Sequence, residues 1–280
     1  MKILLVIFLL SLSGNIYAGD IPLPESSPES VGLSSERLKR IDTVFETGIS
    51  EKRIPGAVIA IARHGKLVFF KAYGMQNAST GTPMRTDSIF RIYSMTKPLV
   101  SIGAMTLHEE GKLYLSEPVG KYLPDIMNMT VAKANRDPVT GIDTVEIVAA
   151  EQPIKIHDLL RHTSGFTYGF FGHSPARQKL KESGIGDLNA MDVSLKDFVS
   201  QLAKLPLAYQ PGKHWEYGRS VEVLGHLMEV VSGQKLDSFM ITSIFEPLEM
   251  VDTGFWVPKK AGSEAARRPP FTIFLHGPPG

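Results

Sequence analysis

The sequence contains no cysteine among its 280 residues, so a disulfide framework and a lipid-modified cysteine are both excluded. Stability must come from an ordinary hydrophobic core, which a chain of this length can form. The net charge is +1, and charged residues make up 21% of the chain. This balance does not favour nucleic acid or an anionic membrane surface as a partner. We expect one domain, or two packed lobes, acting on a small molecule.

Two common catalytic signatures are also missing. No HExxH sequence is present, and His157 and His162 are five residues apart, so they would not share one face of a helix. The nearest match to a G-x-S-x-G nucleophile elbow, residues 172–176, lacks its second glycine and has no strand before it. We therefore expect no metal and no cofactor, and an α/β-hydrolase is disfavoured.

The N-terminal segment has the features of a secretory signal peptide. Lys2 precedes an apolar run over residues 3–12, which is too short to span a membrane, and Ala18 is a small residue placed for cleavage. We expect residues 1–18 to be removed, the mature protein to have no stable membrane anchor, and its location to be periplasmic or secreted.

Hydrophobic periodicity predicts an α+β protein. Residues 34–51 have helical spacing, and residues 57–63 and 67–73 read as two strands of a hairpin joined at His64 and Gly65. Residues 94–250 are predicted to be mostly helical, with helices in 154–165 and 220–233. The Gly-rich segment 165–187 has the length of a functional loop. Its aromatic residues either cover the core or form the wall of an acyl pocket.

The stretch FRIYSMTKPLVSIGAMTLHEEG places Ser94 three residues before Lys97 at the start of an apolar helical run. Residues at i and i+3 share a helix face, so the Lys97 amine can reach the Ser94 hydroxyl. Serine needs a base to become a good nucleophile, and a lysine serves as one when its amine is neutral. Burial and the positive end of the helix dipole both favour the neutral amine.

The sequence therefore predicts a helix that begins at Ser94, is packed on all sides and holds a nucleophile beside a base. The Ser94 backbone N–H is a candidate donor to a developing oxyanion. A second S-x-x-K match, Ser232 to Lys235, lies where a helix stops at Gly233, and we expect no function for it.

Several blocks together resemble the serine β-lactamase and penicillin-binding superfamily, most closely the class C-related esterases called family VIII. These blocks are FRIYSMTKPLVSIGAMTLHEEGKLYL, IHDLLRHTSGFTYGFF, YQPGKHWEYGRSVEVLGHLMEVVSG and FEPLEMVDTGFW. The S-x-x-K motif is itself a recognised signature of this superfamily. The resemblance covers residues 28–257 and implies a helical region packed on an antiparallel sheet.

The resemblance also implies roles for further residues. Tyr217 in WEYGRS matches a tyrosine that shares the proton of the serine and passes it to the leaving group. Arg219 stands where the family often has asparagine. We assign Phe166, Tyr168, Phe170 and Arg219 as candidate substrate-binding residues, beside the candidate catalytic residues Ser94, Lys97 and Tyr217.

The family places a third, Gly-containing strand motif well over a hundred residues after this tyrosine, and none is found here. Residues 258–280 no longer resemble the family, so we interpret 19–257 as the hydrolase domain and 258–280 as an atypical, disordered tail. A hairpin without its sheet partners exposes edges and an apolar face. We accordingly expect an incomplete sheet, low stability and weak activity.

Three functions stay open at this point. The first is a carboxylesterase that acts on short-chain acyl esters through an acyl-enzyme, and the resemblance favours it. The second is a β-lactamase or a D-alanyl-D-alanine carboxypeptidase, which uses the same chemistry on an amide. The third is a non-catalytic pseudoenzyme or binding fragment.

Overall fold

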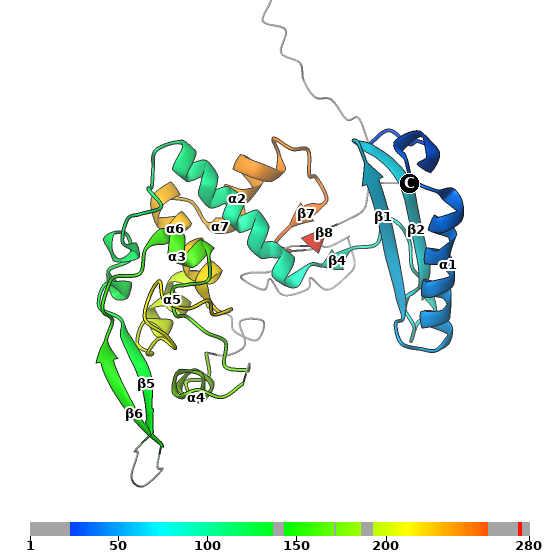
Figure 1. Cartoon of the computed structure of the whole chain (residues 1–280). Helices are drawn as coiled ribbons and strands as arrows, with labels where there is room; N and C mark the ends of the chain where they lie inside the picture. Colours follow the sequence, from blue (N-terminus) through cyan, green and yellow to red (C-terminus); the bar gives the residue numbers. More distant parts are fainter. Residues whose placement is uncertain (1–22, 137–142, 171, 186–192, 257–273, 276–280) are drawn as a thin grey trace, which may run out of the picture. The chain divides into compact units, whose positions relative to one another are not determined.

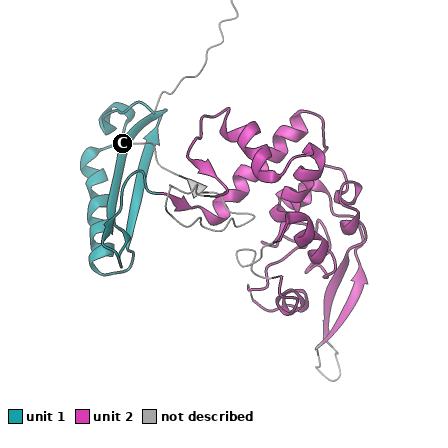
Figure 2. Ribbon diagram, turned by 180° about the vertical axis from the view of Figure 1, so that it is seen from behind, with its two compact units in different colours: residues 1–88, 280 teal, residues 89–279 magenta. Residues whose placement is uncertain are grey.

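The computed structural model describes residues 23–136, 143–170, 172–185, 193–256 and 274–275. The chain divides into two compact units, one over residues 1–88 and one over residues 89–279 (Figure 2). The predicted signal peptide, residues 1–18, lies outside the described residues.

The first unit packs one helix on a small antiparallel sheet (Figure 1). Its elements are η1 Pro28–Val31, α1 Ser35–Ser50, β1 Gly56–Arg63, β2 Lys66–Asn77 and β3 Thr82–Pro83, with sheet order β1-β2-β3. Ser34 caps α1 by accepting a hydrogen bond from the Arg37 N–H. The Tyr73 hydroxyl on β2 donates to Asp42 on α1 at 2.6 Å, which ties the helix to the sheet.

The turn between β1 and β2 explains the register of the hairpin. His64 and Gly65 have φ values of 53° and 69°, the left-handed conformation that a two-residue hairpin turn requires. Gly74 must be glycine because its φ is 69° and an added Cβ would lie 2.4 Å from the Pro55 carbonyl oxygen. The predicted helix and hairpin of this unit are both confirmed.

The second unit consists of helices with two short antiparallel sheets, of order β4-β8-β7 and β5-β6. Its strands are β4 Phe90–Arg91, β5 Thr130–Arg136, β6 Asp143–Ala149, β7 Thr253–Gly254 and β8 Phe274–Leu275. Its α-helices are α2 Thr96–Glu109, α3 Ile156–Leu160, α4 Pro175–Glu182, α5 Leu195–Leu202, α6 Ser220–Ser232 and α7 Leu236–Met240. Single turns are formed by η2 Tyr93–Met95, η3 Val119–Lys121, η4 Pro124–Ile126 and the π-helical η5 Ile241–Phe245.

Helix α6 lies at the centre of this unit and is contacted by α2, α3, α5 and α7 (Figure 1). Val223, Leu224, Leu227 and Met228 have essentially no exposed surface. Gly103 on α2 allows the close approach, because an added Cβ would lie 2.6 Å from the Met240 Sδ atom. The hydrophobic effect of this buried cluster holds α2 in place, and α2 carries the candidate base.

Three expectations for this region were wrong. Residues 130–136 and 143–149 pair as strands β5 and β6 in a stretch predicted to be mostly helical. The loop 165–187 contains helix α4, capped by Ser174. Helix α2 is not packed on all sides, since Ile102 is 50% exposed and Met105 is 41% exposed.

The predicted tail, residues 258–280, lies outside the described residues except for Phe274–Leu275. This segment pairs with both β4 and β7 as strand β8. No helix within the described ranges is both long and apolar enough to cross a membrane.

Candidate active site

Ser94 lies in the single turn η2, immediately before helix α2, and its side chain is exposed. The helix itself begins two residues later than predicted, at Thr96, with Pro98 in its first turn. Tyr93, directly before Ser94, has a φ of 45°. A bulky residue in the left-handed region costs about 1–3 kcal/mol, and such strain is frequent at functional sites.

The Ser94 hydroxyl is in contact with both of its predicted partners. The Lys97 Nζ donates a hydrogen bond to Ser94 Oγ at 3.3 Å. The Tyr217 hydroxyl oxygen lies 2.7 Å from the same Oγ atom, although the two residues are 123 positions apart. The structure therefore brings the three candidate catalytic side chains together around one oxygen atom.

The surroundings of the Lys97 side chain are aromatic. Its Nζ lies 5.0 Å from the ring centroid of Tyr217 and 5.7 Å from that of Tyr168, both within the range of cation–π attraction. Within the described parts of the chain, no acidic side chain forms an ion pair with Lys97.

Tyr217 is positioned by the loop that carries it, which runs along residues 162–168. The Glu216 N–H donates to the His162 carbonyl oxygen at 2.8 Å. The Glu216 carboxylate is buried, accepts a hydrogen bond from Thr167 and forms an ion pair with Arg177 of α4 at 2.6 Å. Gly218 follows, where an added Cβ would lie 2.2 Å from the Phe166 carbonyl oxygen. This packing fixes the tyrosine against Ser94.

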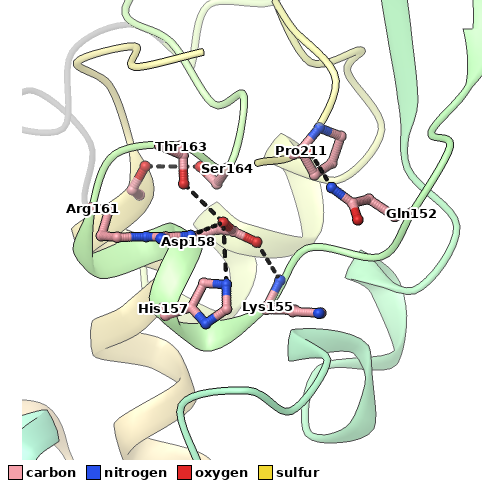
Figure 3. A network of polar contacts seen from close by, with 9 residues as sticks. Gln152, Lys155, His157, Asp158, Arg161, Thr163, Ser164 and Pro211 are labelled. Atoms are coloured by element: carbon pink, nitrogen blue, oxygen red, sulfur yellow. Dashed lines mark hydrogen bonds and ion pairs between the residues drawn. The ribbon is translucent and has the colours of Figure 1, made fainter. Parts of the chain in front are cut away.

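A second network fixes residues 162–164 from the other side (Figure 3). Asp158 on α3 is 2% exposed, and its carboxylate accepts hydrogen bonds from the Thr163 hydroxyl at 2.8 Å and from Arg161 at 2.9 Å. It also accepts a bond from the Lys155 N–H, which caps the helix. The Ser164 hydroxyl lies 2.9 Å from that of Ser220, the first residue of α6.

His162 lies against Tyr217, with ring centroids 4.9 Å apart. Its φ is 57°, and its Nδ1 atom is buried with no hydrogen-bond partner among the described residues. Burial, and then the positive charge of Lys97, lower the pKa of the imidazole below its ordinary value of 6.5. The imidazole is therefore neutral at pH 7.

The aromatic residues predicted to bind substrate have different environments. Phe166 is 3% exposed and belongs to the core. Tyr168 is 6% exposed, and its hydroxyl lies 3.3 Å from the Glu222 carboxylate. Phe170 is 67% exposed and stacks on Tyr168, with ring centroids 4.9 Å apart. Of the three, only Phe170 offers most of its surface to a ligand.

Arg219 is also buried. Its side chain is 6% exposed, it forms an ion pair with Glu222 at 3.0 Å, and its guanidinium lies 4.5 Å from the Tyr168 ring centroid. The charge of Arg219 is thus engaged by Glu222 and the Tyr168 ring, and its assignment to substrate binding stays a prediction. The serine of the second S-x-x-K match is bonded differently from Ser94. The Ser232 hydroxyl accepts a hydrogen bond from the Gln234 N–H at 3.2 Å.

Sequence reasoning did not identify His162, Trp215, Glu216 or Glu222 as parts of this region. His162 is the histidine of HTSG, and Glu216 directly precedes Tyr217. Both lie in the sequence blocks that resemble the family, and this position could have indicated them. Trp215 is 67% exposed and stacks on Tyr217 with a centroid distance of 6.1 Å. Among the described residues, no group of three or more His, Asp or Glu side chains is placed to hold a metal ion.

The helical region, the small antiparallel sheets and the Ser–Lys–Tyr cluster are those of the β-lactamase and transpeptidase class. A family model described as Beta-lactamase matches residues 41–272. The chain belongs to this family. The match extends beyond Pro258, which corrects the expectation that the likeness ends there.

Individual relatives are esterases and acyl-transferring enzymes. Esterase EstB of Burkholderia gladioli is 34% identical over 231 residues, which cover 81% of this chain and 54% of EstB. The solved structure of EstCE1, a hydrolase with promiscuous acyltransferase activity, has a TM-score of 0.67 and 28% identity, covering 82% of this chain and 59% of EstCE1.

Unliganded simvastatin synthase LovD from Aspergillus terreus gives a TM-score of 0.66 and 25% identity, covering 88% of this chain and 65% of LovD. The chain spans about half the length of the curated relatives it matches.

Proposed function

We propose that this protein is a serine hydrolase that acts on carboxylic esters of short acyl chains through an acyl-enzyme. The single observation that carries the proposal is the placement of the Lys97 amine and the Tyr217 hydroxyl on the same Ser94 oxygen, at 3.3 and 2.7 Å. These distances are within reach for proton transfer. The likeness to EstB and EstCE1 supports an ester as the substrate.

The reaction proceeds in two halves. Ser94 Oγ attacks the carbonyl carbon of the ester while its proton passes to Lys97 or Tyr217. The same pair then gives the proton to the departing alkoxide, and the acyl group remains on Ser94. Water next attacks the acyl carbonyl, loses a proton to the pair and releases the carboxylic acid, and the proton returns to Ser94.

Exposed apolar side chains close to Ser94 support an acyl substrate. Tyr93 and Met95 flank Ser94 in the chain and are 62% and 64% exposed, while Trp215 and Phe170 are both 67% exposed. Trp215 stacks on Tyr217, and Phe170 stacks on Tyr168, whose ring packs on Tyr217. Apolar surface removed from water on binding would contribute about 25 cal/mol per Å².

The test uses the purified full chain with p-nitrophenyl butyrate, a chromogenic cephalosporin and a fluorophosphonate probe for reactive serines. Ser94→Ala is compared with Ser232→Ala, which removes the serine of the other S-x-x-K match and serves as the matched control. We expect ester turnover and probe labelling in the wild type and in Ser232→Ala, and neither in Ser94→Ala.

Two other results would replace the proposal. Turnover of the cephalosporin without turnover of the ester would indicate a β-lactamase or a carboxypeptidase instead. A folded wild-type chain that the probe does not label and that turns over neither compound would indicate a non-catalytic protein.

We also propose that the protein works in the periplasm or outside the cell. The proposal rests on the signal-peptide pattern of residues 1–18. N-terminal sequencing of protein expressed with its leader should give a chain that begins at Gly19. Recovery of an intact Met1 in the cytoplasm would contradict this.

A further inference from the structure

Arg219 and Glu222 form a charged pair in the interior, directly after the loop that carries Tyr217. Arg219 is the residue before α6 and Glu222 lies in the first turn of that helix, and their side chains are 6% and 3% exposed. Removing two charges from water costs free energy that their attraction seldom fully returns, so a buried ion pair is weak evidence for stability. The position of this pair therefore calls for a role other than stability.

The pair contacts one side chain of the site, Tyr168, in two ways. The Arg219 guanidinium lies 4.5 Å from the Tyr168 ring centroid, within the range of cation–π attraction. The Tyr168 hydroxyl lies 3.3 Å from Glu222 Oε1, the oxygen that also accepts the hydrogen bond of Arg219. Ring and hydroxyl are thus held by opposite charges of the same pair.

The Tyr168 phenol is in no position to exchange protons with the site. Burial, and then the Glu222 carboxylate, raise the pKa of Tyr168 far above its ordinary value, so the phenol stays protonated and acts as a donor. Its hydroxyl is bonded to Glu222, while the ring contacts the site.

The ring of Tyr168 contacts two of the three candidate catalytic side chains. The Lys97 Nζ lies 5.7 Å from its centroid, and the Tyr217 ring lies 5.5 Å away at an angle of 56°. Since no acidic side chain of the described residues pairs with Lys97, these ring contacts and the bond to Ser94 are what orient the amine.

We propose that the Arg219–Glu222 pair is a positioning element that holds the Tyr168 ring beneath Lys97 and Tyr217 and so keeps both on the Ser94 oxygen. Tyr168, Arg219 and Glu222 then act as positioning residues and do not contact the substrate. The expected change in ester hydrolysis rests on the proposed function, whereas the expected placement of Lys97 rests on the geometry alone.

The test replaces the pair by apolar residues of similar size, in the double variant Arg219→Met with Glu222→Leu. Such replacements of a buried ion pair are often neutral or stabilising, so the variant is expected to fold. Tyr168→Phe keeps the ring and loses only the hydroxyl. Arg85→Met is the control, since it removes the arginine of an arginine–acid pair with Asp87 that has no part in the site and whose arginine is 67% exposed.

The first readout does not need activity. Protein with ¹³C-labelled lysine is studied by NMR, and the Lys97 signal is assigned by its loss in Lys97→Arg. Ring currents of Tyr168 and Tyr217 should displace the Lys97 Hε signals from those of exposed lysines in the wild type and in Arg85→Met, and to a smaller extent in Tyr168→Phe. In the double variant these signals should move toward the position of exposed lysines.

The second readout is ester hydrolysis. Misplacement of the base by about 1 Å costs up to roughly 100-fold in rate, so we expect kcat of the double variant to fall between about 10- and 100-fold with KM changed less than about 3-fold. Tyr168→Phe loses the bond to Glu222 but keeps the ring on the Arg219 guanidinium, so its kcat should fall less than that of the double variant.

A folded double variant with an unchanged Lys97 signal and an unchanged kcat would overturn the proposal. If the wild type hydrolyses no ester, the proposed function fails, and the NMR comparison alone then decides whether the pair positions Lys97.

Discussion

Ser164 and Ser220 face each other in the interior, with their hydroxyl oxygens 2.9 Å apart and no exposed surface on either residue. This contact joins Ser164, the last residue of the segment 162–164, to the first residue of α6. The loop that carries Tyr217 therefore enters α6 at a fixed position. Two segments that are 56 positions apart are linked here by one hydrogen bond between hydroxyl groups.

Replacing either serine alone by alanine should therefore destabilise the fold. A single replacement leaves the other buried hydroxyl without this partner, which costs about 1–3 kcal/mol. The double variant removes both polar groups and should lose less than the sum of the two single variants. Urea unfolding of the four proteins measures this coupling, and strictly additive losses would show that the hydroxyls do not interact.

Glu216→Gln should destabilise the fold and slow the reaction together. The substitution leaves the Arg177 guanidinium, 17% exposed, without the carboxylate that neutralises it, at a cost of about 3 kcal/mol. Because Glu216 is bonded to the segment that packs on Tyr217, kcat should fall as well. Denaturant unfolding and initial ester hydrolysis rates check the two effects. A stable variant with full activity would contradict the role given to this ion pair.

Gly218→Ala should abolish activity. The new Cβ would lie 2.2 Å from the Phe166 carbonyl oxygen and 2.5 Å from the Thr167 Cα atom, so backbone must move on one side or the other. Gly169→Ala is a suitable control, because its Cβ would have its nearest contact at 3.4 Å. We expect the control to retain solubility and ester hydrolysis. Equal activity of the two variants would rule out close packing at Gly218.

Tyr93→Asn should raise stability. Asparagine adopts the left-handed conformation at lower cost than tyrosine, and the Tyr93 side chain is 62% exposed, so little burial is lost. We expect a gain of about 0.5–1 kcal/mol in the free energy of unfolding. Tyr93→Phe, which keeps the strain, should show no gain. A lower stability of Tyr93→Asn would mean that the backbone there is not strained.

Stability should decrease as the pH falls below 6.5, with a contribution from His162. Its pKa is lowered in the folded protein, so the unfolded chain binds more protons in the range between the folded value and 6.5. Stability from this group is therefore fully present above pH 6.5 and is lost as the pH falls toward the folded pKa. His162→Gln should flatten the unfolding free energy in this range relative to wild type, and an unchanged slope would contradict the assignment.

Local patterns predicted those features that depend on neighbouring residues. The His64-Gly65 turn, the capped helix α1 and the closeness of Ser94 to Lys97 all follow from spacing within a few residues. The contact of Tyr217 with Ser94 spans 123 positions, and only the family resemblance indicated it.

Other features were not predicted from spacing. Thr130 to Arg136 and Asp143 to Ala149 pair residue by residue, although an alternation of apolar and polar residues in this region could have indicated strands. The family resemblance made Arg219 a candidate substrate-binding residue but did not indicate its burial, where Glu222 and the Tyr168 ring compensate its charge. Partners of this kind are set by tertiary structure.

The most direct test of the account is the rate at which Ser94 becomes acylated. The full chain, Lys97→Met and Tyr217→Phe are each mixed with p-nitrophenyl butyrate, quenched at increasing times and digested, and the peptide with Ser94 is followed by mass spectrometry. We predict that one butyryl group appears on Ser94 in the wild type and appears at least about 100-fold more slowly in each variant. Acylation of Ser94 at the wild-type rate in Lys97→Met would contradict the claim that this amine activates the serine.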